Sequence, residues 1–244
     1  MKSKHSRLDR FINKHSHFSL SDTRLLIAQG RILVDSQPAH SIRQRIGEFS
    51  TVVLDGLYLQ DRQPVYLMFN KPKGCVCATK DNKHKTVLDF LEHPQKQELH
   101  IVGRLDFNST GLVLLTNDGA WSRKLSLPET KLNKIYRVVL AKAITEAELA
   151  SYQKAFSEGM YFGYEGVQTK PAVLELINPN TALVTLVEGK YHQVKRMFGR
   201  FDNEVLELHR LSVGHIALDE DLQEGDAREL SKTESALDSR VRRS

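Results

Sequence analysis

The chain has 244 residues, 40% of them hydrophobic, and a net charge of +5, which is typical of a globular protein large enough to bury a core. No apolar run is long enough to cross a bilayer, and the basic N-terminal segment lacks the apolar stretch of a secretory signal, so we expect no membrane association. Residues 1–62 carry ten Lys/Arg against six Asp/Glu, a difference of +4, whereas residues 63–244 carry 25 against 24. A basic segment beside a near-neutral body predicts an anionic partner, most commonly nucleic acid.

The first sixty residues predict two short helices followed by strands. Leu8, Phe11 and Ile12 repeat at helical spacing. Ser21 is a suitable N-cap for a second helix that ends at Gly30. The segment RILVD then predicts a strand, and TVVLDGLYL predicts two strands around an Asp-Gly turn.

The segments SRLDRFI and SLSDTRLLIAQGRILVD resemble the small RNA-binding domain first described in a ribosomal protein and shared by tyrosyl-tRNA synthetases. That family usually has Arg directly after the second Ser, where this chain has Asp22, with Arg24 two places on. The resemblance implies an RNA-binding domain over residues 5–62. Phosphates require charge and reach rather than a fixed code, and the candidate contacts are Arg7, Arg10, Arg24 and Arg31.

The remainder predicts strands with intervening helices, which indicates an α+β fold over residues 63–232. The expected strands are VYLMFN, a strand containing both cysteines, GLVLLT, KIYRVVL, a hairpin of KPAVLELI and ALVTLVEG, and closing strands within EVLELHRLSVGHIAL. The expected helices are VLDFLEH after Thr86, AWSRKLSLP up to Pro128, AELASYQKAF after Thr145, and KYHQVKRMFGRF. Residues 233–244 are predicted to be a frayed polar tail.

Cys75 and Cys77 are spaced to lie on one face of a strand. This spacing disfavours a disulfide between them, and no second Cys pair completes a zinc site. We therefore interpret them as small core side chains in a reducing cytoplasm, and we expect no metal.

Two carboxylates flank the apolar segment GLVLLT. Asp106 lies in GRLDFNSTG, and Asp118 follows twelve residues later in an Asn-Asp-Gly turn. The intervening strand is about 20 Å long, which argues against a glycosidase pair, whose carboxylates are roughly 5–10 Å apart. Asp118 is interpreted as a turn residue, and Asp106 alone could be a structural loop acid or a reactive carboxylate.

The segment EGKYHQVKRMFGRF predicts a helix whose buried face is formed by Val194, Met197, Phe198 and Phe201. Lys195 borders that face, so it could reach a partly buried anion or simply extend its ammonium into water. His192 could be a base, although the chain has ten histidines. Tyr136 shares a strand face with Val138 and Leu140, where it could pack or stack on a base.

Taken together, GRLDFNSTGLVLLTNDG, KIYRVVL, TKPAVLEL, EGKYHQVKRMF and VLELHRLSVGHIAL resemble the ribosomal RNA pseudouridine synthases, specifically the branch acting on small-subunit (16S) RNA. The resemblance implies a catalytic domain with a mixed, mainly antiparallel sheet flanked by helices. It implies that Asp106 acts at the sugar of a flipped uridine, as nucleophile or as base, beside the cation of Lys195, while Tyr136 stacks on the uracil. Arg104 is implied to contact the RNA, and we include His192, Gln193 and Arg196 of the matching motif among the candidate RNA contacts.

The resemblance implies no metal, cofactor or nucleotide cofactor, because the reaction is an isomerisation. We expect a cytoplasmic monomer whose partner is ribosomal RNA or an assembling small ribosomal subunit. The alternatives are an enzyme acting on large-subunit RNA, whose relatives typically have R-Q-[IV]-R-R-M where this chain has HQVKRM, and a non-catalytic RNA-binding assembly factor. A carboxylate-based hydrolase is disfavoured by the spacing of Asp106 and Asp118.

Overall fold

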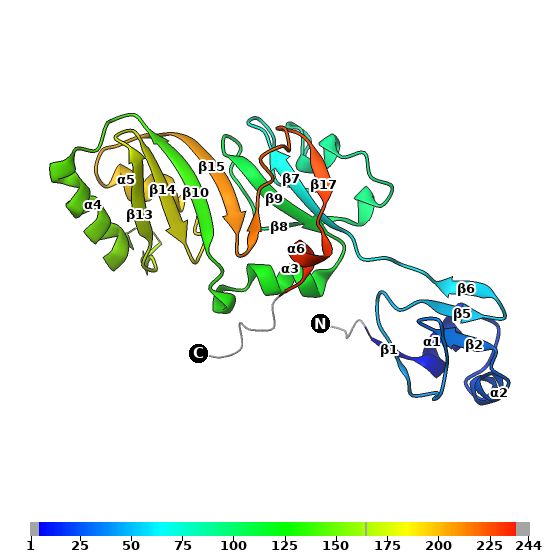
Figure 1. Cartoon of the computed structure of the whole chain (residues 1–244). Coiled ribbons are helices and arrows are strands. Elements are labelled where there is room, and N and C mark those ends of the chain that lie inside the picture. The colour runs from blue at the N-terminus through cyan, green and yellow to red at the C-terminus, as the bar shows by residue number, and fades with distance from the viewer. Residues whose placement is uncertain (1–4, 164, 238–244) are drawn as a thin grey trace. The chain divides into compact units, whose positions relative to one another are not determined.

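The computed structural model describes residues 5–163 and 165–237 (Figure 1). The chain divides into two compact units, residues 1–64 and residues 65–244, and each is described by itself. No helix among the described residues is long and apolar enough to cross a membrane.

The N-terminal unit contains the two predicted helices, α1 (Leu8–His15) and α2 (Asp22–Ala28). A four-stranded antiparallel sheet has the order β3 (Gln37–Pro38), β2 (Ile32–Val34), β5 (Val52–Leu54) and β6 (Leu57–Gln60), and β1 (Ser6–Arg7) pairs with β4 (Arg45–Ile46). The helices and the sheet bury one apolar cluster that includes Leu8, Ile12, Leu26, Ile32 and Val52. The spacing of the apolar residues therefore predicted this unit correctly.

The start of α2 differs from the expectation. Ser21 makes no capping hydrogen bond with its side chain. Instead, the amide and hydroxyl of Ser19 both donate to the Asp22 carboxylate, at 2.8 and 2.7 Å, and these bonds lower the pKa of Asp22. Asp22 thus organises the turn that leads into α2.

The C-terminal unit is built on one mixed sheet with the order β13-β14-β10-β15-β9-β7-β17. The strands are β7 (Tyr66–Lys71), β8 (His100–Val102), β9 (Thr110–Thr116), β10 (Lys134–Leu140), β13 (Val173–Asn178), β14 (Thr181–Leu186), β15 (Val205–Val213), β16 (Ile216–Ala217) and β17 (Ala227–Glu229). Their pairings are antiparallel except for the one between β15 and β9, and β8 and β16 pair with β9 and β15 respectively. A separate pair is formed by β11 (Tyr161–Phe162) and β12 (Val167–Gln168). The predicted α+β class with a mainly antiparallel sheet is confirmed.

Both faces of the sheet are buried at β9. The helices of this unit are α3 (Gly119–Ser126), α4 (Glu146–Glu158), α5 (Gln193–Gly199) and α6 (Lys232–Ser235), with short 3-10 turns at Val87–Phe90, Lys96–Glu98 and Pro128–Thr130. In Figure 1, α4 lies along β13, and α3 lies beside β8. Alternate residues of β9 enter two different cores: Val113 and Leu115 join the larger one, while Leu112 and Leu114 pack with Trp121. Burial on both faces explains why the sequence of β9 is a continuous apolar run.

The two halves of this sheet meet at a short parallel seam. Only His209 with Thr110 and Arg210 with Gly111 are paired between β15 and β9. Gly111 has φ +97°, and a Cβ atom there would lie 2.4 Å from the carbonyl oxygen of Arg210. The backbones therefore approach so closely at the seam that this position requires glycine.

Two local predictions were wrong. The cysteine segment forms no strand, only an isolated bridge between Val76 and Thr86. Asp118 is more than a turn residue, because its carboxylate caps α3 by accepting from the amides of Ala120 and Trp121 and also accepts from the Tyr66 hydroxyl. The Asn-Asp-Gly sequence correctly marked the end of β9, but it did not indicate that Asp118 caps α3.

The segment expected to fray is partly ordered. Residues 232–235 form α6, Trp121 donates its indole N–H to the Ser235 carbonyl at 2.8 Å, and Leu237 packs against the same core as Trp121. Residues 238–244 of the predicted tail lie outside the described residues.

Arg228 on β17 connects α6 to the sheet, and its ion pair predicts a pH dependence. Its guanidinium donates to Asp219 at 2.6 Å and to Glu234 at 2.8 and 3.0 Å. The hydrogen bonds from Arg228 lower the pKa of Glu234 to about 2. A lowered carboxyl pKa stabilises the folded state above the pKa of the unfolded chain, and that stabilisation disappears as pH falls towards the folded value. We therefore expect Glu234→Gln to lower the free energy of unfolding at pH 7, with the difference from wild type shrinking as pH falls below about 4.5.

Urea denaturation at a series of pH values measures this difference. Glu220→Gln, which alters an exposed acid of the same C-terminal stretch, is the control and should show a much smaller difference. A Glu234→Gln difference that stays constant down to pH 2 would contradict the assignment.

Candidate active site

Asp106 lies in the connection between β8 and β9, and a buried lysine fixes the backbone of that connection. The Lys71 side chain is fully buried at the end of β7. Its ammonium donates to the carbonyls of Ser109 at 2.8 Å, Pro72 at 3.0 Å and Phe107 at 3.3 Å. Burial is the main reason that the pKa of Lys71 is lowered, and the nearby thiols and the Asp106 carboxylate oppose that effect. The lysine therefore acts as a donor to the turn that follows Asp106.

A second buried cation contacts the other end of the same connection. Arg210, on β15, is 2% exposed. Its Nε donates to the Leu112 carbonyl at 2.7 Å, and its Nη1 lies 3.4 Å from the Arg104 carbonyl. Its Nη2 has no hydrogen-bond partner among the described residues. Buried backbone carbonyls require donors, and Arg210 supplies them on both sides of Asp106.

The residues adjacent to Asp106 are also anchored. The Leu105 side chain packs in the larger core, and its amide donates to the Cys77 sulfur at 3.3 Å. The Phe107 carbonyl accepts from the Gly74 amide at 3.0 Å. Hydrogen bonds and packing thus fix the residues on both sides of Asp106, and its side chain projects from this fixed backbone.

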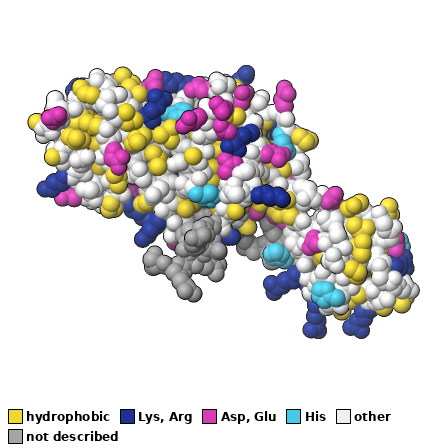
Figure 2. Space-filling model, in the orientation of Figure 1, with side chains coloured by type: hydrophobic (Ala, Val, Ile, Leu, Met, Phe, Trp, Pro, Cys, Tyr) yellow, Lys and Arg dark blue, Asp and Glu magenta, His cyan; other side chains and the backbone are white. Residues whose placement is uncertain are grey.

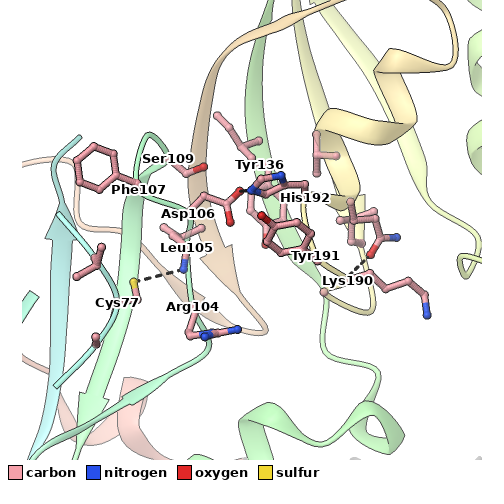
Figure 3. Close-up of a pocket in the computed structure, with 17 residues that line it drawn as sticks. Cys77, Arg104, Leu105, Asp106, Phe107, Ser109, Tyr136, Lys190, Tyr191 and His192 are labelled. Atoms are coloured by element: carbon pink, nitrogen blue, oxygen red, sulfur yellow. Dashed lines mark hydrogen bonds and ion pairs between the residues drawn. The ribbon is translucent and has the colours of Figure 1, made fainter. Parts of the chain in front are cut away.

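The Asp106 carboxylate faces two basic side chains. Its Oδ2 atom lies 3.5 Å from Nε2 of His192 (Figure 3) and 4.0 Å from Nζ of Lys195. The Asp106 side chain is 31% exposed, and the two partners are exposed to a similar degree. The family resemblance implied Lys195 as the partner of this carboxylate. The structure has a partly exposed carboxylate with two partners, and His192 is the nearer one.

The start of α5 holds His192 in place. His192 has a left-handed backbone conformation with φ +48°, which is uncommon for a residue with a side chain. Its ring stacks on that of Tyr191, with centroids 3.9 Å apart. The Gln193 side chain is buried, accepts from the Lys190 amide and donates to Glu188, each at 3.0 Å. Local strain of this kind concentrates at functional sites.

Asp106 and His192 line a pocket of about 450 Å³, whereas Lys195 is not among its lining residues. Asp106 and Arg104 line one side, Tyr191 and His192 line the other, and Tyr136 from β10 lies between them (Figure 3). Tyr136 is 7% exposed and pairs in register with Arg210. A cavity of this size is in the range that holds a small organic group.

The other predicted RNA contacts differ in their surroundings. Arg104 is exposed at the pocket. Arg196 forms a bidentate ion pair with Glu165 and covers the Phe162 ring at 3.7 Å. The Gln193 amide is bonded within the protein, as described above.

The arginines of the N-terminal unit also fall into two groups. Arg31 forms a bidentate pair with Asp55, at 2.7 and 2.6 Å, and Arg7 pairs with Asp9 at 2.6 Å. Arg10 and Arg24 are exposed and make no ion pair with another described residue. Figure 2 shows Lys and Arg side chains projecting from this unit.

Several residues of the site were missed in the sequence. Lys71 ends the strand segment VYLMFNK, and Arg210 lies within the segment LELHRLSV. A charged residue in a mostly apolar strand was the feature that could have indicated their roles. Tyr191 lies within the segment EGKYHQVKRMF but was not selected as a site residue, and it is 70% exposed. Among the described residues no group of three His, Cys, Asp or Glu side chains could hold a metal ion.

The role of Lys71 can be tested by stability. Lys71→Met keeps most of the side-chain volume but leaves the Ser109 carbonyl without its buried donor, whereas the Phe107 carbonyl keeps the Gly74 amide. Each unpaired buried group costs about 1–3 kcal/mol, so we expect the free energy of unfolding to fall by about that amount. Faster hydrogen exchange of the amides between residues 106 and 111 should accompany the loss.

The matched control for this test is Lys73→Met. Lys73 is exposed and lies 3.7 Å from Glu207, so its replacement should change stability by less than about 0.5 kcal/mol. Equal stability of Lys71→Met and wild type would show that another donor satisfies the Ser109 carbonyl.

Known proteins resemble this chain over nearly its whole length. The sequence profile of the RNA pseudouridylate synthase family matches residues 65–199. The protein named ribosomal small subunit pseudouridine synthase A of Pseudomonas aeruginosa is 47% identical over 229 residues, which cover 93% of this chain and 98% of that protein. The protein of the same name from Escherichia coli K12 is 41% identical over 231 residues, with coverage of 94% and 98%. A crystal structure described as a pseudouridylate synthase aligns with a TM-score of 0.67 and 37% identity, covering 94% of this chain and 97% of that one. With the sequence, the fold and the length all in agreement, the chain belongs to the RNA pseudouridylate synthase family.

Proposed function

We propose that this protein isomerises a specific uridine of small-subunit (16S) ribosomal RNA to pseudouridine. The observation that carries the proposal is the Asp106 carboxylate, which lies beside the basic side chains of His192 and Lys195 at the edge of a pocket containing a buried tyrosine. The ribosomal substrate is supported by the names of the relatives, which are similar along nearly their full length.

The reaction requires little beyond a positioned carboxylate. The N1–C1′ bond of uridine breaks, the uracil turns over, and C5 bonds to C1′. The hydrogen displaced from C5 leaves as a proton while N1 regains one, so atoms balance without an oxidant or a co-substrate. Asp106 acts at the sugar, as nucleophile or as base.

Two basic side chains adjoin the Asp106 carboxylate. Lys195 and His192 both approach its Oδ2 atom. The Oδ1 atom accepts no hydrogen bond from any described residue and is the oxygen left for the substrate.

The pocket accepts the base after the nucleotide leaves the RNA stack. Enzymes that act on a base extrude the nucleotide into a pocket, where aromatic side chains stack on it. Tyr136 is the aromatic side chain between the two walls and receives the uracil, while Arg104 and His192 contact the RNA beside it. Gln193 and Arg196 contribute by shaping α5, since their polar groups bond to Glu188 and Glu165.

The N-terminal unit supplies further RNA binding. Arg10 and Arg24 are the phosphate contacts best supported, because they are exposed and unpaired among the described residues. Arg7 and Arg31 have acidic partners and would have to exchange them for phosphate. The proposal places the protein in the cytoplasm as a monomer that acts on ribosomal RNA or on an assembling small subunit.

Chemical mapping of pseudouridine in ribosomal RNA from cells lacking this protein tests the function. We expect one modification of small-subunit RNA to disappear and to return with the wild-type gene. Loss from large-subunit RNA would redirect the substrate assignment, and an unchanged pattern in both RNAs would favour a non-catalytic binding protein.

Asp106→Asn tests the chemistry directly. The amide cannot act as a carboxylate nucleophile or base, so we expect the isomerisation rate to fall by about 10²–10⁴-fold or more while RNA affinity stays close to wild type. Single-turnover release of tritium from C5-labelled uridine measures the rate. Asp118→Asn, which alters a carboxylate outside the pocket, is the control, and turnover retained in Asp106→Asn would overturn the assignment.

The N-terminal contacts are tested by the salt dependence of binding. Each lost phosphate contact reduces the slope of log affinity against log salt by about 1. We expect the double variant Arg10→Ala, Arg24→Ala to lose about 2 from that slope, measured by filter binding to unmodified small-subunit RNA. An unchanged slope would place the phosphate contacts elsewhere.

A further inference from the structure

A basic loop lies between Cys77 and Thr86 in the C-terminal unit. Residues 79–85, TKDNKHK, are all exposed and contain three lysines, one histidine and a single acid, Asp81. The base of the loop is closed, because the Val76 amide donates to the Lys85 carbonyl at 2.9 Å and the Val87 amide donates to the Val76 carbonyl at 3.0 Å. The loop is therefore a fixed projection with a net formal charge of about +2 at neutral pH when His84 is neutral.

The one acid of the loop does not neutralise its lysines. Asp81 Oδ1 accepts from the amides of Lys83 and His84, both at 2.8 Å. These backbone hydrogen bonds are the main cause of its lowered pKa. Lys80 and Lys83 form no ion pair with any residue that the structure describes, so their charges are available to an external anion.

The loop contacts the active-site segment. The His84 ring packs on the Phe107 ring with centroids 4.8 Å apart, and Phe107 directly follows Asp106. Cys77 and Ala78, which lead into the loop, line the same pocket as Asp106 (Figure 3). The loop thus starts at the pocket wall and returns to the residue beside the carboxylate.

An RNA bound at this pocket must pass close to the loop. Only one nucleotide enters the pocket, so the phosphates on either side of it lie at the rim. Exposed lysines bind phosphate through charge and reach, and such contacts fix the position of the nucleic acid without reading its sequence.

We propose that residues 79–85 form a phosphate-binding arm for the RNA backbone next to the target uridine, and that the His84–Phe107 contact connects this arm to the Asp106 segment. The inference rests on the proposed function and deepens it. The arm is a second electrostatic contact, located in the unit that carries the reactive carboxylate. Its lysines act on RNA binding, whereas the His84 ring acts on the geometry of the Asp106 segment.

The experiment compares two double variants of the full chain that remove the same charge. Lys80→Ala with Lys83→Ala removes the free cations of the arm. Lys142→Ala with Lys154→Ala removes two exposed lysines at and just before α4 and serves as the control. Binding to unmodified small-subunit RNA is measured against salt concentration, and isomerisation is measured by tritium release at saturating RNA.

We expect the arm variant to bind about tenfold more weakly at 0.1 M salt and to lose about 1–2 from the salt slope, with the rate at saturation close to wild type. The control variant should differ from wild type by much less in both binding measurements. Equal binding and equal slope in the two double variants, with isomerisation intact, would overturn the arm and leave the proposed function standing. A wild-type protein that isomerises no ribosomal RNA would instead overturn the proposed function.

Histidine 84 is tested separately, because its ring is assigned a positioning role. His84→Ala should lower the single-turnover rate several-fold at saturating RNA, and His84→Phe, which keeps a ring against Phe107, should restore it. Equal rates in the alanine variant and wild type would remove the connection between the arm and Asp106.

Discussion

The geometry of the site depends on two cations that are buried in order to hold backbone. Removing Lys71 and Arg210 from water is costly unless hydrogen bonds replace the lost hydration. In this protein the replacements are carbonyl oxygens of the segment that contains Asp106 and of the residues that flank it. The same contacts that make these charges tolerable in the core therefore fix the main chain around the Asp106 carboxylate. One set of hydrogen bonds therefore both stabilises the fold and positions the segment that carries Asp106.

The electrostatics of the site reflect a second constraint. A pocket that receives a nucleotide from folded RNA has to remain open, and the Asp106 side chain is 31% exposed. Its basic neighbours are Lys195 on α5 and His192, the residue before α5, and the left-handed backbone at His192 brings the nearer one into position. Acidic and basic side chains are interspersed over the larger unit in Figure 2. Local groups of charge such as the basic loop therefore contribute more to RNA binding than the net charge of this unit.

Much of this architecture could be predicted from periodicity and caps, because burial repeats with the secondary structure. Val113 and Leu115 alternate with Leu112 and Leu114 across two cores, and Thr145 caps α4 as its sequence indicated. The pairing of Asp106 with Lys195 was suggested by family resemblance, not by spacing, since the two are distant in sequence. Lys71 and Arg210 were overlooked because their role depends on carbonyls of another strand, which no local pattern records. The prediction of a strand at the cysteine segment was wrong for a related reason. Alternating residues form a strand only where a partner strand is present, and Val76 forms only an isolated bridge.

The seam at Gly111 has a consequence for how the pocket can vary. Asp106 precedes β9 on one side of the seam, whereas Tyr136 and the helix carrying Lys195 are attached to β10 and β15 on the other. The two walls of the pocket thus lie on opposite sides of the seam, which joins them through two residue pairs at a point where the backbones almost touch. A small change in the backbone at this seam would lengthen or shorten the distance between the Asp106 carboxylate and the Lys195 ammonium without replacing either residue. Tolerance to substitution should accordingly be lowest along this seam, even though none of its paired residues lines the pocket.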